Sequence, residues 1–212
     1  MVQKTENFLQ ETFAASEYLT AHPSERDYRL EHSYRVANIA KTIAEAEGFD
    51  VTRAVIAGLL HDISYCEEMT TREDRLNHGR RSAAIARPFL ESLGLDSHTV
   101  NEICYGIAIH VDDEADFTWE RTPFCETVGD ADNIDRFDVY RVYESLQYMK
   151  FSEMPLAEKQ DRVNSMIDKL TRYKDMKLGT ETAKKLWIER LDYQLGFYDR
   201  LKAQLENSTT IR

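Results

Sequence analysis

The sequence predicts an all-α protein. Only 8 glycines and 4 prolines interrupt its 212 residues, which is sparse for a chain of many short strands. Apolar residues recur at helical spacing along nearly the whole chain, and no repeat of fixed period is present. These observations favour a compact bundle of long helices.

Cap signals place the helices of the first half. Gly48 is expected to end the helix whose apolar stripe includes Val36, and Asp50 is a suitable N-cap for the next helix. That helix, VTRAVIAGLLHDIS, is apolar on almost every side and should be buried. The polar segment 66–77 is predicted to be a loop, and Pro88 to kink or split the helix after it. The expected helices are about 2–18, 27–47, 51–64 and 78–93.

Similar signals mark the second half. Asp96 or Ser97 can cap a helix that ends near His110, and the segment VDDEADFTWER is predicted to be a loop. Thr122 followed by Pro123 predicts a helix start, because proline is favoured at the first helical position. The expected helices are about 97–110, 122–148, 156–173 and 181–205.

No linker that would divide the chain is visible. The sequence therefore predicts a single all-helical domain over residues 1–212, with a core at about 28–148 and a C-terminal helical extension at about 149–212. The last amphipathic helix is able to pair with a copy of itself, which allows a homodimer.

Charge and cysteine content exclude several classes of protein. The net charge is −11 and no basic stripe is visible, which argues against binding to nucleic acid or to anionic membranes. No run approaches the roughly 20 apolar residues of a membrane span. The three cysteines are odd in number and lack CxxC spacing, as is typical of a reducing compartment. We therefore expect a cytoplasmic protein.

Six titratable residues from five predicted helices stand where packing favours leucine. A single buried histidine usually bonds a backbone carbonyl, but six polar groups buried without partners would be costly. One or two divalent ions satisfy them together, and imidazole and carboxylate ligands suit Mn, Fe, Zn or Co. The candidate metal ligands are His32, His61, Asp62, His78, His110 and Asp132.

The order of these residues resembles the H…HD…D signature of HD superfamily phosphohydrolases. His32 comes first, His61 and Asp62 follow in AGLLHDIS, and Asp132 ends the series in DADNID. The resemblance covers about residues 28–140. It implies a helical, metal-dependent phosphohydrolase that holds Mn, Fe, Co, Mg or Zn through those four positions.

Two further histidines, His78 and His110, resemble those of family variants that bind two metal ions, such as hydrolases of dinucleoside polyphosphates and cyclic-dinucleotide phosphodiesterases. Tyr65 departs from the variants that bind one metal ion, which carry a catalytic glutamate three residues after the HD pair. No GYP tripeptide is present, which argues against the cyclic-di-GMP branch.

The resemblance implies catalytic roles for Asp62, His78 and His110. Asp62 would hold or bridge the metal ions, which supply an activated water for attack on phosphorus. His78 and His110 would hold a second ion or, with one ion, protonate the leaving oxygen. Asp132 matches the family's last ligand better than Asp130, and both Asp130 and Asp135 are candidates for orienting a ligand from behind.

The expected substrate is a small phosphorylated molecule, and a nucleotide fits best. Its phosphates need cationic partners, and the arginines around His78 are candidates. These are Arg72, Arg75, Arg80 and Arg81. Two other functions remain open, namely a metal-dependent oxygenase on the same scaffold and a non-catalytic module that binds a nucleotide or a metal.

Overall fold

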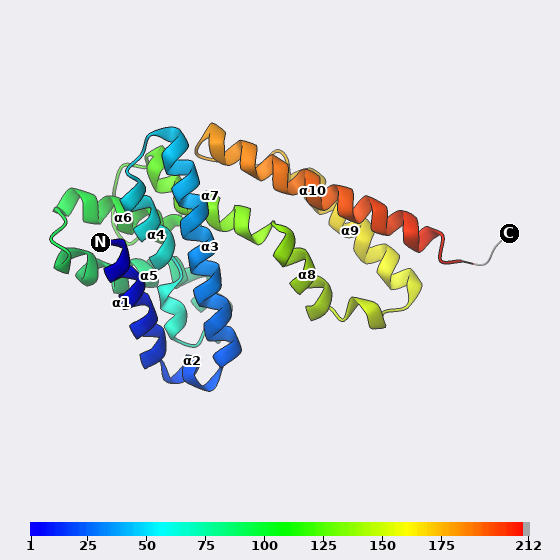
Figure 1. Cartoon of the computed structure of the whole chain (residues 1–212), viewed down its shortest axis with the longest axis horizontal. Coiled ribbons are helices and arrows are strands. Elements are labelled where there is room, and N and C mark those ends of the chain that lie inside the picture. Colours follow the sequence, from blue (N-terminus) through cyan, green and yellow to red (C-terminus); the bar gives the residue numbers. More distant parts are fainter. Residues whose placement is uncertain (210–212) are drawn as a thin grey trace. The chain divides into compact units, whose positions relative to one another are not determined.

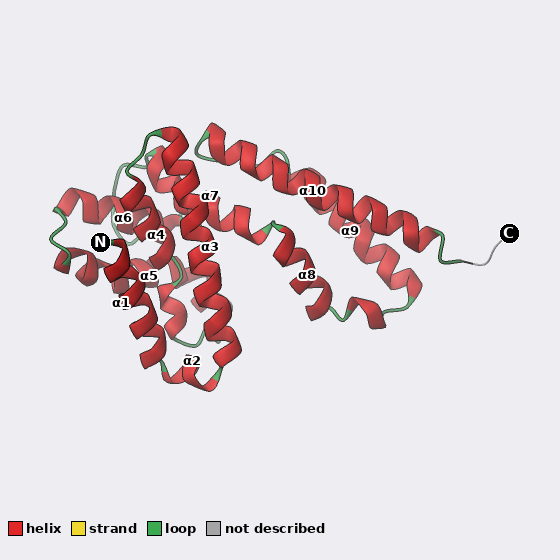
Figure 2. Ribbon diagram, in the orientation of Figure 1, coloured by secondary structure: helices red, strands yellow, loops and turns green. Residues whose placement is uncertain are grey.

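The computed structural model describes residues 1–209, which form helices and loops without a strand among them (Figure 2). This confirms the predicted all-α class. The α-helices are α1 (Val2–Ala15), α2 (Glu17–Ala21), α3 (Pro23–Glu47), α4 (Val51–Leu60), α5 (Arg72–Ser92), α6 (Ser97–Ile109), α7 (Pro123–Arg136), α8 (Val139–Tyr148), α9 (Leu156–Tyr173) and α10 (Glu181–Glu206). Short 3-10 helices, η1 (Ile63–Cys66) and η2 (Phe151–Glu153), follow α4 and α8.

Capping residues set several helix ends where the sequence predicts them. Gly48 takes a left-handed φ of 74° directly after α3. The carboxylate of Asp50 accepts a hydrogen bond from the amide of Arg53 at 3.0 Å and thereby begins α4. Asp96 begins α6 in the same way, by accepting from the amide of Thr99 at 3.0 Å.

The start of α5 was predicted wrongly. The helix begins at Arg72 and not near His78, because Thr71 and Asp74 form a capping box in which each side chain accepts from the other residue's amide. The same helix runs through Pro88 without a break, so the predicted split does not occur.

Three other predicted helices are divided. The helix expected over 51–64 ends at Leu60, and the 3-10 helix η1 begins at Ile63. The helix expected to reach about Tyr148 stops at Arg136, because the carboxylate of Asp138 accepts from the amide of Val139 at 2.7 Å and caps a new helix, α8. At the N-terminus α1 stops at Ala15, since the side chain of Ser16 caps the short helix α2.

Helices α1 to α7 supply most of the first of two compact units, unit 1, which comprises residues 1–135 and 178–183 (Figure 1). In unit 1, α3 packs against α4 and α5 against α6. A Cβ at Gly58 of α4 would lie 2.7 Å from the Cα of Ala37 on α3, so glycine is needed for the close approach of these helices. The buried core includes Leu9, Phe13, Val36, Ile43, Ile56, Leu59, Leu60, Ile103, Ile107 and Val128.

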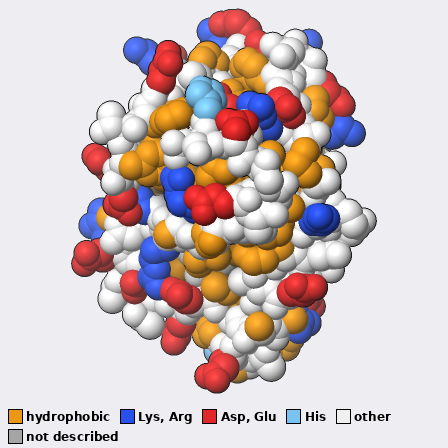
Figure 3. Space-filling model, turned by 90° about the vertical axis from the view of Figure 1, so that its left-hand side faces the viewer, with side chains coloured by type: hydrophobic (Ala, Val, Ile, Leu, Met, Phe, Trp, Pro, Cys, Tyr) orange, Lys and Arg blue, Asp and Glu red, His pale blue; other side chains and the backbone are white. Residues whose placement is uncertain are grey.

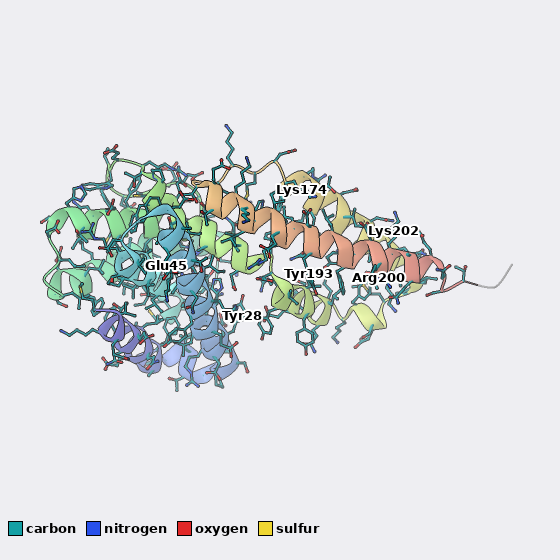
Figure 4. All side chains as sticks on the ribbon, turned by 45° about the horizontal axis from the view of Figure 1, so that its top comes forward. Tyr28, Glu45, Lys174, Tyr193, Arg200 and Lys202 are labelled. Carbon is teal, nitrogen blue, oxygen red and sulfur yellow. The ribbon has the colours of Figure 1, made fainter. Side chains whose placement is uncertain are left out.

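Among the described residues, unit 2 comprises 136–177 and 184–209, and Trp187 is fully buried. The indole Nε1–H of Trp187 donates to the carbonyl oxygen of Tyr173 at 2.8 Å, and the Phe137 ring packs against the indole at a centroid distance of 4.9 Å. Tyr193 on α10 points outward and is 55% exposed (Figure 4). The predicted division into a core and an extension within one domain stays a prediction, because two compact units need not fold independently.

Charged side chains of both signs lie on the surface. On the face drawn in Figure 3, basic side chains are scattered among acidic and apolar ones. Among the helices within residues 1–209, none is both long and apolar enough to cross a membrane.

Candidate metal centre

The six candidate ligands converge in unit 1. His32 lies on α3, whereas His61 and His110 immediately follow the last residues of α4 and α6. The His61 side chain is fully buried, and that of His78 on α5 is the most accessible of the four imidazoles at 12% exposure. In chain order the set is His32, His61, Asp62, His78, His110 and Asp132.

The carboxylate of Asp62 lies between the imidazoles. Its Oδ1 is 3.0 Å from the Nε2 of His78 and 3.7 Å from the Nε2 atoms of His61 and His110. Its Oδ2 is 3.6 Å from the Nε2 of His32. One oxygen of Asp62 therefore faces three imidazoles, and the other faces the fourth.

The imidazole nitrogens also approach one another. The Nε2 atoms of His61 and His32 are 3.3 Å apart, and those of His78 and His110 are 3.0 Å apart. The Nε2 of His32 is 3.2 Å from Oδ1 of Asp132. Two groups of three residues place their ligand atoms within 4.8 Å of one another, namely His32, His61 and Asp132, and His61, Asp62 and His110.

Backbone carbonyls orient three of the imidazoles through Nδ1. His61 donates to the oxygen of Gly58 at 2.8 Å, His78 to that of Arg75 at 2.6 Å, and His110 to that of Ile107 at 2.6 Å. Each acceptor lies three residues earlier in the chain. Because a carbonyl only accepts, Nδ1 carries the proton and, in a neutral ring, leaves a lone pair on Nε2.

A carboxylate orients the fourth imidazole. His32 Nδ1 is 2.7 Å from Oδ2 of Asp135, and Asp135 in turn accepts two hydrogen bonds from Arg35, at 2.7 and 3.2 Å. Asp135 thus lies directly behind His32, at the position expected for a residue that orients a ligand.

This donor set fits a divalent metal. Three imidazoles whose Nδ1 protons are committed to carbonyls direct their Nε2 atoms at one region. Nitrogen lone pairs at such short separations repel unless a proton or a metal cation lies among them. Imidazole nitrogens with carboxylate oxygens are ligands that Mn, Fe, Co and Zn accept. The cluster is therefore able to hold a metal.

Burial and neighbouring charges shift the pKa values of the residues in the centre in opposite directions. Burial disfavours protonation of His32, but hydrogen bonds to Asp132 and Asp135 outweigh it and raise its pKa to about 9. Burial lowers the pKa of His61 to about 4, so this imidazole is neutral at physiological pH. Burial alone would raise the pKa of Asp62, yet its histidine neighbours hold that pKa well below the usual value. The carboxylates that favour a proton on His32 favour a metal cation there for the same reason.

Glycine and serine hold the α5 side of the cluster in place. A Cβ at Gly79 would lie 2.6 Å from the carbonyl oxygen of Ala108, so glycine allows α5 and α6 to bring His78 and His110 together. The hydroxyl of Ser64 donates to the carbonyl oxygen of His78 at 2.9 Å and fixes the backbone at that residue.

Asp130 faces away from the six-residue cluster, although it is buried on the same helix as Asp132. Its Oδ2 accepts a hydrogen bond from the amide of Gly179 at 2.9 Å. Burial, with a contribution from the nearby Glu126, raises its pKa to about 7. Its geometry therefore differs from that of Asp132, which contacts His32 directly.

The four arginines near His78 lie on α5. Arg80 binds both carboxylate oxygens of Asp112, at 2.9 and 3.1 Å, and Arg81 pairs with Glu67 and Asp74. Arg75 donates to the carbonyl oxygen of Met69, and Arg72 is exposed at the first position of the helix. Their role in substrate binding stays a prediction.

Two other arginines of the site were missed from the sequence. Arg29 and Arg35 lie three residues before and after His32, so helical spacing brings all three to neighbouring positions on α3. Arg29 pairs with Asp62 and Arg35 with Asp135. The spacing was a usable signal, but it does not reveal which carboxylates the arginines meet.

The family follows from a comparison with known protein families. The HD domain matches residues 29–140, a span that contains all six candidate ligands. The chain belongs to the HD domain family, which confirms the resemblance predicted from His32, His61, Asp62 and Asp132. No curated protein matches the chain.

Two solved structures share the fold. A predicted HD superfamily hydrolase from an uncultured Thermotogales bacterium is 23% identical, with a TM-score of 0.65 over 95% of this chain and 91% of that one. Bacillus subtilis YpgQ, solved in complex with ADP, is 20% identical, with a TM-score of 0.63 over 96% of this chain and 94% of that one. These likenesses support a fold of the HD superfamily hydrolase type.

Proposed function

We propose that this protein is a metal-dependent phosphohydrolase that cleaves a phosphoester or phosphoanhydride of a small molecule. The observation that carries the proposal is the position of Asp62, whose two oxygens face different imidazoles. A carboxylate so placed can bridge two cations, and paired cations are a common means of cleaving phosphate bonds.

Two metal ions fit the donor set better than one. His32, His61 and Asp132 would hold one ion, and His78 and His110 the other, with Asp62 shared between them. When bound, divalent ions supply a nucleophilic water near neutral pH and neutralise phosphoryl charge. The predominance of imidazole favours Mn, Fe, Co or Zn over Mg, which prefers oxygen ligands.

The chain's own residues orient the imidazole rings around such a centre. Asp135 and the three carbonyl acceptors fix the imidazole rings, which limits reorganisation during a reaction. His78 is the most accessible of the four imidazoles, so it is the best placed to give a proton to a leaving oxygen if it holds no metal.

We further propose a nucleotide as the substrate and the cytoplasm as the place of action. Support for a nucleotide comes from the similar fold of YpgQ, which was solved with ADP. An accessible arginine such as Arg72 and the partly accessible Tyr28, whose ring lies parallel to that of His32, offer contacts of the kind that phosphates and bases use.

Metal stoichiometry is the first test. Protein purified without chelators and without a metal-affinity column should contain about two transition-metal ions per chain by elemental analysis. The same protein should release phosphate or pyrophosphate from at least one member of a panel of nucleoside mono-, di- and triphosphates and dinucleoside polyphosphates.

The outcomes separate the candidate functions. One ion per chain would assign His78 and His110 to proton transfer or substrate contacts. Metal without turnover on any phosphate ester, together with dioxygen consumption, would replace the proposal with an oxygenase. Nucleotide binding without turnover would leave a binding module.

A further inference from the structure

Arg29 places a positive charge at the edge of the metal cluster. It lies on α3 about one turn before His32, and its Nη1 donates to Oδ2 of Asp62 at 3.2 Å. Its side chain is only 18% exposed. A cation in contact with the carboxylate at the centre of the cluster will also be near any anion that binds there.

The ring of Tyr65 holds this guanidinium in place. The Cζ of Arg29 lies 3.3 Å from the centroid of the Tyr65 ring, at the start of the segment that follows the HD pair. Stacking of this kind fixes the plane of a guanidinium and leaves its edge available for hydrogen bonds. Arg29 is therefore oriented before a ligand arrives.

Most of the donors on Arg29 remain unused. A guanidinium has five N–H groups. Among residues 1–209, one of those of Arg29 donates to Asp62, and a side-chain hydrogen bond with Tyr65 uses a second. Its Nη2 is 3.8 Å from Glu25, which is an ion pair without a hydrogen bond. Its Nε is buried and has no partner in the described chain. An unpaired buried donor is costly, so Arg29 is incomplete without a further acceptor.

The neighbouring arginines differ from Arg29 in this respect. Arg35 donates twice to Asp135, and Arg80 donates three times to Asp112. Arg81 is paired with Asp74 and Glu67. The donors of these three side chains are largely taken up by carboxylates. Arg29, in contrast, lies at the cluster and keeps spare donors.

We propose that Arg29 binds a non-bridging oxygen of the substrate's phosphoryl group at the metal centre, with Tyr65 as its positioning platform. This inference rests on the proposed phosphohydrolase function and names the residue that recognises the phosphoryl group. Phosphate oxygens are acceptors that suit the planar donor edge of arginine, and they would accept from N–H groups of Arg29 that Asp62 and Tyr65 leave unused.

The test measures binding of inorganic phosphate to the manganese-loaded full chain by isothermal titration calorimetry. A charge-assisted hydrogen bond contributes about 1.5–3 kcal/mol, so Arg29→Gln should weaken phosphate binding by about 10–100-fold. Arg29→Lys should retain part of the affinity through its charge. Tyr65→Phe, which keeps the ring, should bind phosphate like the wild type, and Tyr65→Leu should bind it more weakly.

Two controls separate direct contact from an effect on the metal. Metal content by elemental analysis should be unchanged in Arg29→Gln, and a loss of metal would overturn the inference by showing that Arg29 acts through Asp62. Arg26→Gln changes an arginine one turn earlier on α3 that pairs with its neighbour Asp27, and it should leave phosphate binding unchanged. An equal loss in Arg26→Gln would also overturn the inference.

Turnover on the nucleotide panel distinguishes this inference from the proposed function. Wild-type turnover together with equal phosphate binding by wild type and Arg29→Gln would overturn the role of Arg29 and leave the phosphohydrolase in place. Absence of both turnover and phosphate binding in the wild type would overturn both. In the small variant Arg29→Ala, added guanidinium ion should restore part of the phosphate affinity, which a purely structural role would not produce.

Discussion

The two sides of the metal centre are supported in different ways. On one side, His61, His78 and His110 each donate Nδ1–H to a carbonyl three residues earlier in the chain. On the other side, His32 is held by Asp135, which is 103 residues away and is itself held by Arg35. The first kind of support needs only a helix, whereas the second needs α3 and α7 to pack together.

This difference teaches how the fold sets the chemistry of each imidazole. Carbonyl acceptors fix the ring without adding charge, and burial then lowers the pKa of His61 to about 4. Carboxylate partners add charge, which outweighs the burial of His32 and raises its pKa to about 9. The His32 side is therefore the more basic side and depends more on tertiary structure.

The largest effect is expected where the two sides meet. Asp62→Ala removes the one carboxylate that faces all four imidazoles, so metal should be lost entirely and phosphohydrolase activity with it. Helical content by circular dichroism should persist, because Asp62 lies outside α4. Elemental analysis is the deciding measurement.

His98→Ala is the control for this change. His98 packs on Trp119 at a ring distance of 5.1 Å, and within residues 1–209 it has no contact with the cluster. It should keep both metal and activity. Full activity in Asp62→Ala would contradict the metal-dependent function.

A smaller effect is expected from the support behind His32. Asp135→Asn removes the charge but keeps an acceptor for Nδ1, so metal affinity should fall by about 10–100-fold, as for other residues that orient metal ligands. A competition titration against a chelator gives the change. If the affinity stays the same, carboxylate support is no stronger than carbonyl support, and the contrast between the two sides fails.

The carbonyl-supported side is tested through its backbone. Gly79→Ala places a Cβ 2.6 Å from the carbonyl oxygen of Ala108, so α5 and α6 must separate, at a cost of about 1–3 kcal/mol in the free energy of unfolding. Urea denaturation measures this cost. Gly196→Ala, on a helix face with no atom within 4 Å, should instead be neutral or slightly stabilising.

The smallest effect is expected at Asp130, which lies on α7 but outside the metal centre. Asp130 has a folded pKa raised to about 7, so the native state binds more protons than the unfolded state between about pH 4 and 7. Stability is therefore lost as pH rises through this window and stays lower above it. Asp130→Asn keeps an acceptor for Gly179 without the charge, and should be more stable than the wild type by about 1–2 kcal/mol at pH 8.

The comparison for Asp130→Asn is its thermal unfolding at pH 4 and pH 8. The gain should be smaller at pH 4, where the wild-type carboxyl is protonated when folded. Metal content should not change, because Asp130 faces Gly179. An equal gain at both pH values would contradict the raised pKa.

Local signals explain how much of the fold was predictable. Gly48, Asp50 and Asp96 act within one turn of chain, so their caps were predicted from the sequence. The capping box at Thr71 was missed because the segment around it is polar and lacks an apolar stripe. The end of α7 was missed because apolar periodicity continues past Asp138, whose carboxylate starts the next helix.

The candidate site was also predictable only where local signals were sufficient. The convergence of four histidines with Asp62 and Asp132 was predicted, because inward positions on helices are visible as spacing. The partner of each side chain was not, since Arg29 meets Asp62 and Asp130 meets Gly179 only after distant segments pack. The family match then confirmed the HD resemblance over residues 29–140.

The two tryptophans of the chain provide an optical label for each unit. Trp119 belongs to unit 1, and Trp187 is enclosed by Phe137 and Tyr173 in unit 2. Trp119→Phe leaves an emission that reports on unit 2 alone, and Trp187→Phe leaves one that reports on unit 1. Fluorescence melting of the two variants would thus resolve whether the metal-binding helices and the C-terminal helices lose their structure in one transition or in two.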